Sequence, residues 1–206
     1  MCIKSAELLN ILIIKSILAD DSGLGAVGIF QSVYSISTAY FGVFFTLMGS
    51  YSIPKVATLE KLKDLIFELN TTVRFLLLIY TPIIFTIFIS RSFIITTLYS
   101  NEFMAAKYLL VFQLPAELIR ALSWVTSLWL LPKYKIKQWI IFDIMFYSLF
   151  ILCFYFLLKF MNLGVVSVSI SYFAAYCIYF VVNYFYAFKK IEFNLNLYNI
   201  KMLLIS

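Results

Sequence analysis

Residues 28–54, GIFQSVYSISTAYFGVFFTLMGSYSIP, decide the fold, because they form a long stretch without a single charged side chain. Small residues recur along it at spacings of 4, 3, 4, 3, 4 and 3, at Gly28, Ser32, Ser35, Ala39, Gly42, Thr46 and Gly49. With about 3.6 residues per turn, these positions share one narrow face of a helix. The stretch exceeds the roughly 20 apolar residues that cross a bilayer. It predicts a membrane-spanning helix whose small-residue stripe permits close helix packing or borders a path.

The composition of the whole chain points to the same class of protein. Of its 206 residues, 64% are hydrophobic and only 13% are charged, and the mean hydropathy is +0.98. Soluble domains have about 45–50% apolar and about 25% charged residues. A soluble fold of this size cannot hide so much apolar surface, so we predict an all-α integral membrane protein.

Hydrophobic segments divide the chain into six expected membrane helices, at about 5–19, 25–50, 74–98, 106–131, 137–160 and 164–188. Between the second and the third, residues 58–73 place Leu65, Leu69 and Val73 on one face and charged residues elsewhere. This pattern indicates an amphipathic helix, which either lies along the cytoplasmic interface or forms a solvated linker. We expect a single six-helix membrane domain over residues 1–206.

The loops between these segments alternate in charge. Lysines and arginines gather in 51–74, in 132–137 and in the tail from Lys189 to Lys201, whereas Asp20 and Asp21 lie in a loop of the opposite side. By the positive-inside rule, the basic loops and both termini are cytoplasmic. The basic residues are therefore a topology signal and do not indicate nucleic-acid binding.

Residue types that hold metals or carry out catalysis are scarce. The chain has no histidine, and Cys2, Cys153 and Cys177 lack the spacing of a metal site. We expect no metal, no cofactor and no enzymatic activity.

The fourth segment carries charges deep inside an apolar stretch. Spacings of 4, 3, 4 and 3 place five residues on one helical face: Gln113, Glu117, Arg120, Trp124 and Ser127. A charge near the bilayer centre costs about 2.5–3.5 kcal/mol, so it faces a partner or a wet cavity. One interpretation is a closed ion pair that pins the bundle. We favour a cavity wall, in which Arg120 attracts an anion and Glu117 takes up a proton or cation.

The fifth segment holds one further acid, Asp143, about two turns from the basic loop. It either pairs with a loop lysine or belongs to the same cavity.

Several motifs resemble bacterial polysaccharide flippases of the multidrug/oligosaccharidyl-lipid/polysaccharide exporter superfamily. The stretch from Gly25 to Lys55 resembles their eighth helix, with G-x-x-G-[IL]-[YFW]-Q-[AS] at its start and an aromatic-x-x-Pro-[KR] ending at Tyr51, Pro54 and Lys55. The string QLPAELIRALSW, from Gln113, resembles their tenth helix, and LPKYKIKQWIIFDI resembles the next loop and helix.

On that resemblance, Glu117 and Asp143 occupy the family's acidic positions, while Ala116 replaces the usual glycine before the first acid. The family has twelve helices in two six-helix lobes, and this chain resembles the second lobe. The resemblance implies a flippase of the bacterial inner membrane for undecaprenyl-diphosphate-linked O-antigen or capsule repeat units, working by ion-coupled alternating access. The expected partners are a lipid-linked oligosaccharide, membrane lipids and a separate N-terminal six-helix lobe.

Three other functions stay open at this point. The chain could be a lobe of a cation-coupled multidrug exporter, although its mixture of acid and base favours that less. A membrane polymerase or acyltransferase would need catalytic groups in a large loop, and the predicted outward loops are short. A truncated remnant or accessory subunit without transport activity is the third.

Overall fold

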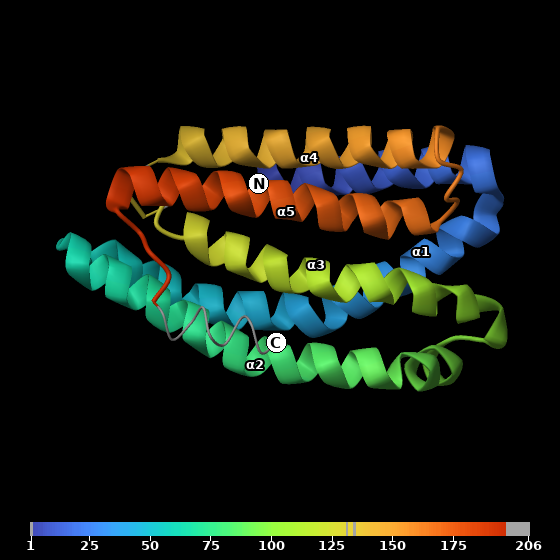
Figure 1. Cartoon of the computed structure of the whole chain (residues 1–206), viewed down its shortest axis with the longest axis horizontal. Coiled ribbons are helices and arrows are strands. Elements are labelled where there is room, and N and C mark those ends of the chain that lie inside the picture. Colours follow the sequence, from blue (N-terminus) through green and yellow to red (C-terminus); the bar gives the residue numbers. More distant parts are fainter. Residues whose placement is uncertain (1, 131, 134, 197–206) are drawn as a thin grey trace.

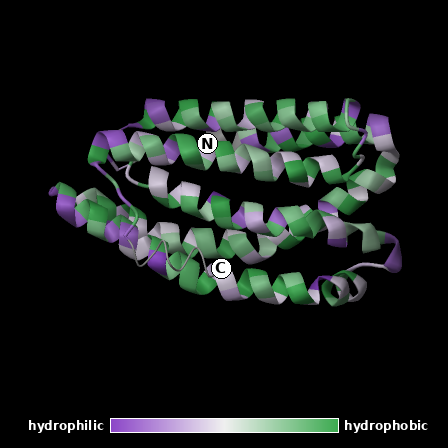
Figure 2. Cartoon of the chain, viewed as in Figure 1, coloured by the Kyte–Doolittle hydropathy of each residue, from purple (hydrophilic) through white to green (hydrophobic). Residues whose placement is uncertain are grey.

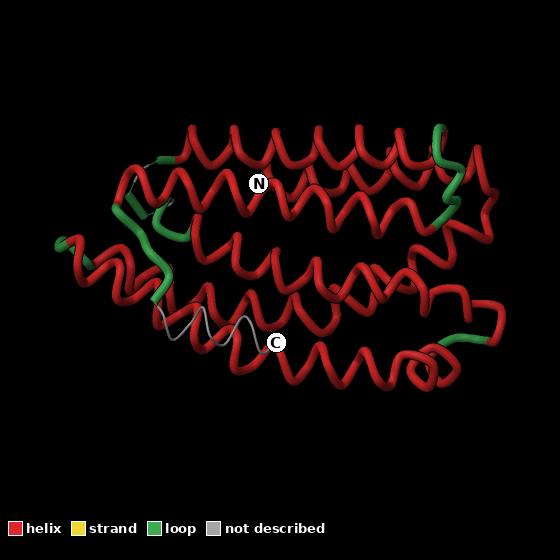
Figure 3. The backbone as a smooth tube through the Cα atoms, viewed as in Figure 1, coloured by secondary structure: helices red, strands yellow, loops and turns green. Residues whose placement is uncertain are grey.

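The computed structural model describes residues 2–130, 132, 133 and 135–196, and side chains from Ala6 onward. The chain folds into α1 (Cys2–Thr58), α2 (Leu62–Leu98), the 3-10 helix η1 (Asn101–Ala105), α3 (Ala106–Ser127), α4 (Ile136–Lys159) and α5 (Val166–Ile191), shown in Figure 1. The described residues contain no strand, and the connections between the helices are short (Figure 3). Residue 131, Tyr134 and Lys201 lie outside the described part.

Four helical stretches are long and apolar enough to cross a membrane: Leu62–Leu98, Asn101–Ser127, Ile136–Lys159 and Val166–Ile191. Apolar residues run along the helices, whereas hydrophilic residues gather where the helices end (Figure 2). The prediction of an all-helical, multi-pass membrane protein is confirmed. Within the described residues, four stretches rather than the predicted six are long and apolar enough to span a membrane.

The first two predicted segments, 5–19 and 25–50, both lie in α1, on the two sides of a kink at Gly23. Gly23 has φ 80° and ψ 173°, a backbone conformation that only glycine adopts readily. Beside the kink, the Lys159 ammonium at the end of α4 donates to Asp21 at 2.6 Å. That hydrogen bond, with a second from Ser22, holds the pKa of Asp21 below its usual value.

Most of the predicted amphipathic helix 58–73, from Leu62 onward, and the third segment 74–98 form one continuous helix, α2. The non-helical connection before this helix lies earlier in the sequence, between Thr58 and Leu62. The helix continues because its buried face does not change at residue 73: Leu65, Leu69, Val73, Leu76 and Tyr80 follow one another at helical spacing and are buried. Residues 62–73 therefore form the first turns of a long helix that packs into the bundle.

Helix α3 lies at the centre of the bundle, between α5 and α2 (Figure 1). In the most apolar stretch of the span that contains α3, 61% of the residues are buried, whereas 17% are buried in the corresponding stretch of α4. Helix α3 is therefore central and α4 is peripheral. Helix α4 buries a single stripe at spacings of four, made of Phe142, Phe146, Phe150, Phe154 and Leu158. Helix α3 ends at Ser127, before the predicted end of the fourth segment at 131, because the chain forms turns from Leu128 onward.

The small-residue stripe of α1 is only partly enclosed. Ser32 is buried and Gly28 lies so close to Phe103 that an added Cβ would stand 3.3 Å from its ring. Farther along, Ala39 and Thr46 are exposed, and Gly42 has nothing within 4 Å of an added Cβ. The buried face of this stretch carries larger residues, Phe30, Val33, Ile36 and Phe41, because they fill the space against α2 and α3 better than small residues do.

Polar contacts close the end of the bundle where α1 meets α2. Lys55 pairs with the buried Glu68 at 2.7 Å, and the Lys133 ammonium donates to the Leu59 carbonyl. The Asn70 amide donates to the Asn194 carbonyl at 3.0 Å and accepts from the Asn196 backbone at 2.8 Å. The segment after α5 is thereby fixed to α2.

The kink at Gly23 gives a test with a matched control. Replacing Gly23 by Ala places a Cβ at a positive φ, so we expect Gly23→Ala to destabilise the protein by about 1–3 kcal/mol. Gly25→Ala adds the same atom two residues later, in a space that is equally open, at an ordinary helical position. It should leave stability unchanged or raise it slightly. Thermal unfolding of both variants in detergent measures the difference, and equal effects would contradict the assigned role of Gly23.

Candidate functional site

A cavity of about 280 Å³ lies among α1, α3, α4 and α5. Along α3 it is lined from Gln113 to Ser127, which is roughly 20 Å at the rise of a helix. Its polar and charged lining is made of Glu7, Asn10, Gln113, Arg120, Ser127 and Asp143. Its aromatic lining is made of Phe30, Tyr34, Phe45, Trp124, Trp139, Phe146, Tyr147, Phe150, Tyr172, Tyr176 and Tyr179. A cavity with charged and polar groups in a largely aromatic wall thus lies inside the helical bundle.

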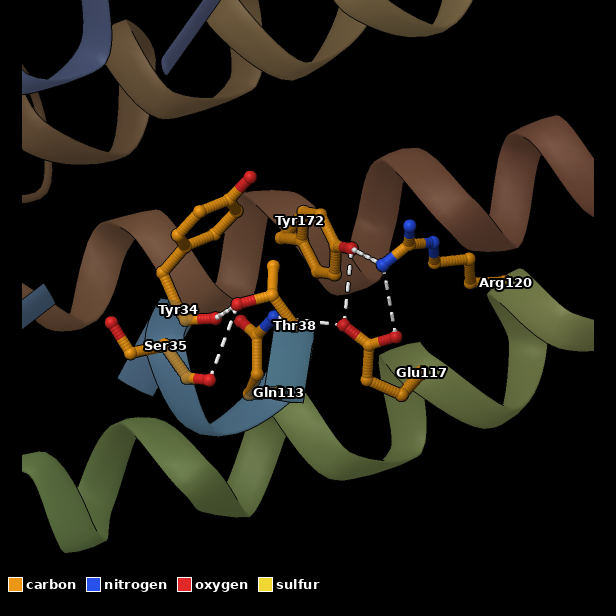
Figure 4. Close-up of polar contacts among 7 residues, drawn as sticks. All are labelled: Tyr34, Ser35, Thr38, Gln113, Glu117, Arg120 and Tyr172. Carbon is orange, nitrogen blue, oxygen red and sulfur yellow. Dashed lines mark hydrogen bonds and ion pairs between the residues drawn. The ribbon is translucent and has the colours of Figure 1, made fainter. Parts of the chain in front are cut away.

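The Glu117 carboxylate lies behind the cavity wall and is held from three directions (Figure 4). The Arg120 guanidinium pairs with it at 3.2 Å, the Gln113 amide donates to it at 3.3 Å, and the Tyr172 hydroxyl donates at 3.2 Å. The Glu117 side chain is 0% exposed, whereas Arg120 is 26% exposed. Glu117 does not itself line the cavity, and its role in the fold is to hold Arg120 at the surface of the wall.

Arg120 is fixed on its other sides by rings. Its guanidinium lies 4.9 Å from the centre of the Phe45 ring of α1, an arrangement that attracts a cation to the π face. The same group donates to the Tyr172 hydroxyl of α5 at 3.4 Å. Trp124 stands edge-on to Phe45, with ring centres 5.7 Å apart. Three helices therefore determine where this cation lies.

Asp143 occupies another part of the wall, on α4. Its carboxylate accepts a hydrogen bond from the Tyr179 hydroxyl of α5 at 3.1 Å. Of the loop lysines, which were expected as possible partners, Lys133 instead donates to the Leu59 carbonyl. Asp143 thus faces the cavity beside a phenol.

The five predicted cavity residues lie in one region, but they occupy two kinds of position. Gln113, Arg120, Trp124 and Asp143 line the cavity, whereas Glu117 supports Arg120 from behind. The helix-packing stripe of α1 does not line this cavity.

Several lining residues did not emerge from the sequence as site candidates. Glu7 and Asn10 come from the first limb of α1, and Asn10 donates to the Tyr147 carbonyl of α4 at 3.1 Å. The tyrosines of α5 lie at 172, 176 and 179, a helical spacing that places them on one face. That spacing was a usable signal, although aromatic residues are so common in this chain, at 19%, that it did not stand out.

Chemically, the cavity offers the groups that bind a polar organic molecule. Within the described part of the chain, no three side chains of the metal-binding types gather at one place. The cavity instead combines hydrogen-bonding groups with flat aromatic surfaces, a combination that orients a ligand by its polar groups and packs its apolar faces.

Comparison with known proteins gives two distant relatives. The Lipid III flippase of Escherichia coli (strain K12) and the Lipid III flippase of Shigella flexneri are each 25% identical to this chain over 169 residues. The matched region covers 82% of this chain and 40% of each relative, so the chain spans about 40% of their length. No family model and no solved structure matches the chain. The chain is a multi-pass membrane protein with distant similarity to two lipid flippases.

Proposed function

We propose that this chain is one lobe of a flippase that moves undecaprenyl-diphosphate-linked sugar repeat units, of the O-antigen or capsule type, across the bacterial inner membrane. The observation that carries this proposal is the cavity of about 280 Å³, lined by charged and hydroxyl groups inside an apolar helical bundle. Ionisable side chains within a membrane are costly, so where they line a cavity they mark a binding site or a path. The distant similarity to two lipid flippases supports the same function.

In this proposal, the cavity holds the sugar head of the substrate while the apolar lipid stays in the bilayer. Gln113, Arg120, Trp124 and Asp143 contact the head, and Glu117 keeps Arg120 in place. Alternating access exposes the cavity first to one side of the membrane and then to the other. The carboxylates near the cavity are the candidates for taking up the coupling proton or cation.

The rest of the transporter is a second six-helix lobe. We propose that the two limbs of α1 both cross the membrane, which with the four other crossings gives six spans and places both termini in the cytoplasm. The exposed part of the small-residue stripe, including Ala39 and Thr46, then faces the first lobe, where small residues allow close approach.

Co-expression tests this arrangement. In a strain lacking its flippase, this chain together with the first lobe of a twelve-helix relative should restore surface polysaccharide, and either half alone should not. Failure of every combination, with both halves present in the membrane, would favour a remnant or accessory subunit over a transporter.

A cation-coupled multidrug exporter is the second candidate, because three carboxylates, Glu7, Glu117 and Asp143, lie in or behind the cavity wall. Such a cavity also suits a cationic drug. An efflux assay with cationic dyes in the same cells separates the two functions, since a glycan flippase should leave dye accumulation unchanged.

Arg120 provides a test of the cavity in the assembled transporter. We expect Arg120→Gln and Glu117→Gln to lower surface polysaccharide roughly tenfold, because each breaks a contact of a charged group worth about 1.5–3 kcal/mol. Arg91→Gln is the control: Arg91 bonds to the Phe88 carbonyl of its own helix at 2.7 Å and does not line the cavity. Normal polysaccharide output from both cavity variants, at equal protein levels, would remove this pair from the mechanism.

Water access to the cavity gives an independent test. In a background without native cysteines, a cysteine at Trp124, which lines the cavity and is partly exposed, should react with a membrane-impermeant thiol reagent in inside-out or right-side-out vesicles. A cysteine at Ser123, on the same helix but 0% exposed and outside the cavity, should not react. Equal protection of both positions in every state would exclude a water-filled path along α3.

A further inference from the structure

The charges around the cavity are unequal in sign. Glu7 and Asp143 line it, and Arg120 is its only cationic lining residue among those described. Arg120 is already paired with the buried Glu117, so the carboxylates outnumber the guanidinium by three to one. In a low-dielectric bundle such an imbalance repels an anion.

A diphosphate carries at least two negative charges, so this cavity opposes its entry. The abundant cations of the chain lie elsewhere, on exposed positions near the helix ends, for example Lys61, Lys63, Lys137 and Lys190. Lys55 and Lys159, which are partly exposed, are already paired with Glu68 and Asp21. The phosphate-binding part of the transporter is therefore outside this cavity.

The aromatic wall gives the cavity a different preference. The Phe146 ring of α4 lies 4.3 Å, centre to centre, from the Tyr176 ring and 5.5 Å from the Tyr179 ring of α5. Phe150 meets Tyr172 edge-on at 5.4 Å. Aromatic faces carry partial negative charge, and they attract the C–H bonds on the face of a sugar ring. Phe146, Phe150 and Tyr179 are largely buried against their neighbours, so this wall offers a pyranose the parts of the rings that reach the cavity.

Acceptors for sugar hydroxyls stand beside this wall. The carboxylates of Asp143 and Glu7 both line the cavity, and a hydroxyl that donates to a carboxylate makes a strong, charge-assisted hydrogen bond. Tyr179 donates to Asp143 at 3.1 Å and thereby fixes its orientation. The same carboxylates attract an ammonium group and repel another carboxylate.

We infer that this lobe binds the sugar of the lipid-linked substrate, in a neutral or amino-substituted form, and leaves the diphosphate to be bound outside the cavity. This inference rests on the proposed function and assigns one part of the substrate to one part of the protein. Sugars with a carboxylate, such as uronic acids, are excluded from this cavity by its charge.

The tryptophans of the chain provide the measurement. Trp124 and Trp139 line the cavity, whereas Trp129 does not and stacks on Tyr186 instead, at 6.0 Å. The whole chain carrying Trp129→Phe, purified in detergent, therefore reports on the cavity through its fluorescence. It is titrated separately with glucosamine, N-acetylglucosamine, glucuronate and inorganic pyrophosphate.

We expect glucosamine and N-acetylglucosamine to change the fluorescence saturably, and glucuronate and pyrophosphate neither to change it nor to compete. Asp143→Asn keeps the size of the side chain but removes its charge, and it should weaken glucosamine binding about tenfold or more. N-acetylglucosamine, which has no ammonium group, should lose less. The matched control is Asp64→Asn, which removes an exposed acid of α2 and should change neither titration.

Saturable binding of pyrophosphate or glucuronate would overturn the inference. So would the absence of any sugar response in protein that is monodisperse and helical. The outcome is separable from that of the proposed function, because binding is measured on the purified chain and transport on co-expressed lobes. Sugar binding without transport would support the sugar site and contradict the flippase function. Transport together with pyrophosphate binding in this cavity would support the flippase function and contradict the assignment of the sugar to this site.

Discussion

A fully buried carboxylate, that of Glu117, is the constraint on which the centre of this structure depends. A charge cannot remain in an apolar bundle without partners, since taking it from water costs several kcal/mol. Glu117 meets this need with Arg120, Gln113 and Tyr172, which come from two helices. Because those partners must converge on one point, α3 and α5 are fixed in register beside each other. Arg120, held in this way, reaches the cavity together with rings of α1 and α5.

The helical architecture of the surrounding bundle also follows from the absence of water in the bilayer core. In lipid, backbone groups must be satisfied within each element, and helices do this alone. Helix α3 is buried over most of its length and carries the polar residues, whereas α4 presents one buried phenylalanine stripe and an apolar outer face. The helix that has most protein around it is thus also the one that holds the buried Glu117 and its partner Arg120. Hydrophilic residues elsewhere gather at helix ends.

Much of the fold was predictable because hydrophobic runs record spans directly, and the helical character of the chain is confirmed. The polar face of 113–127 was also readable, since Glu117 and Arg120 are conspicuous inside an apolar run. What the sequence could not give was the contribution of distant residues: Glu7 and the α5 tyrosines meet that face only after the chain has folded. The stripe beginning at Gly28 shows another limit, because a periodic pattern does not say which of two helix faces the rest of the chain covers. The sequence does not show that α2 is continuous, because its charged, amphipathic first turns resemble a separate interfacial helix.

Because α1 is kinked at Gly23, its two limbs pack against different helices of the bundle. Its first limb touches α4 through Asn10 and Tyr147, and its second limb touches α2 and α3 through Phe41 with Tyr80 and Phe45 with Trp124. The cavity lies between these limbs and is lined by both. The width of the chamber consequently depends on the backbone angles of Gly23, because they set the direction of one limb relative to the other.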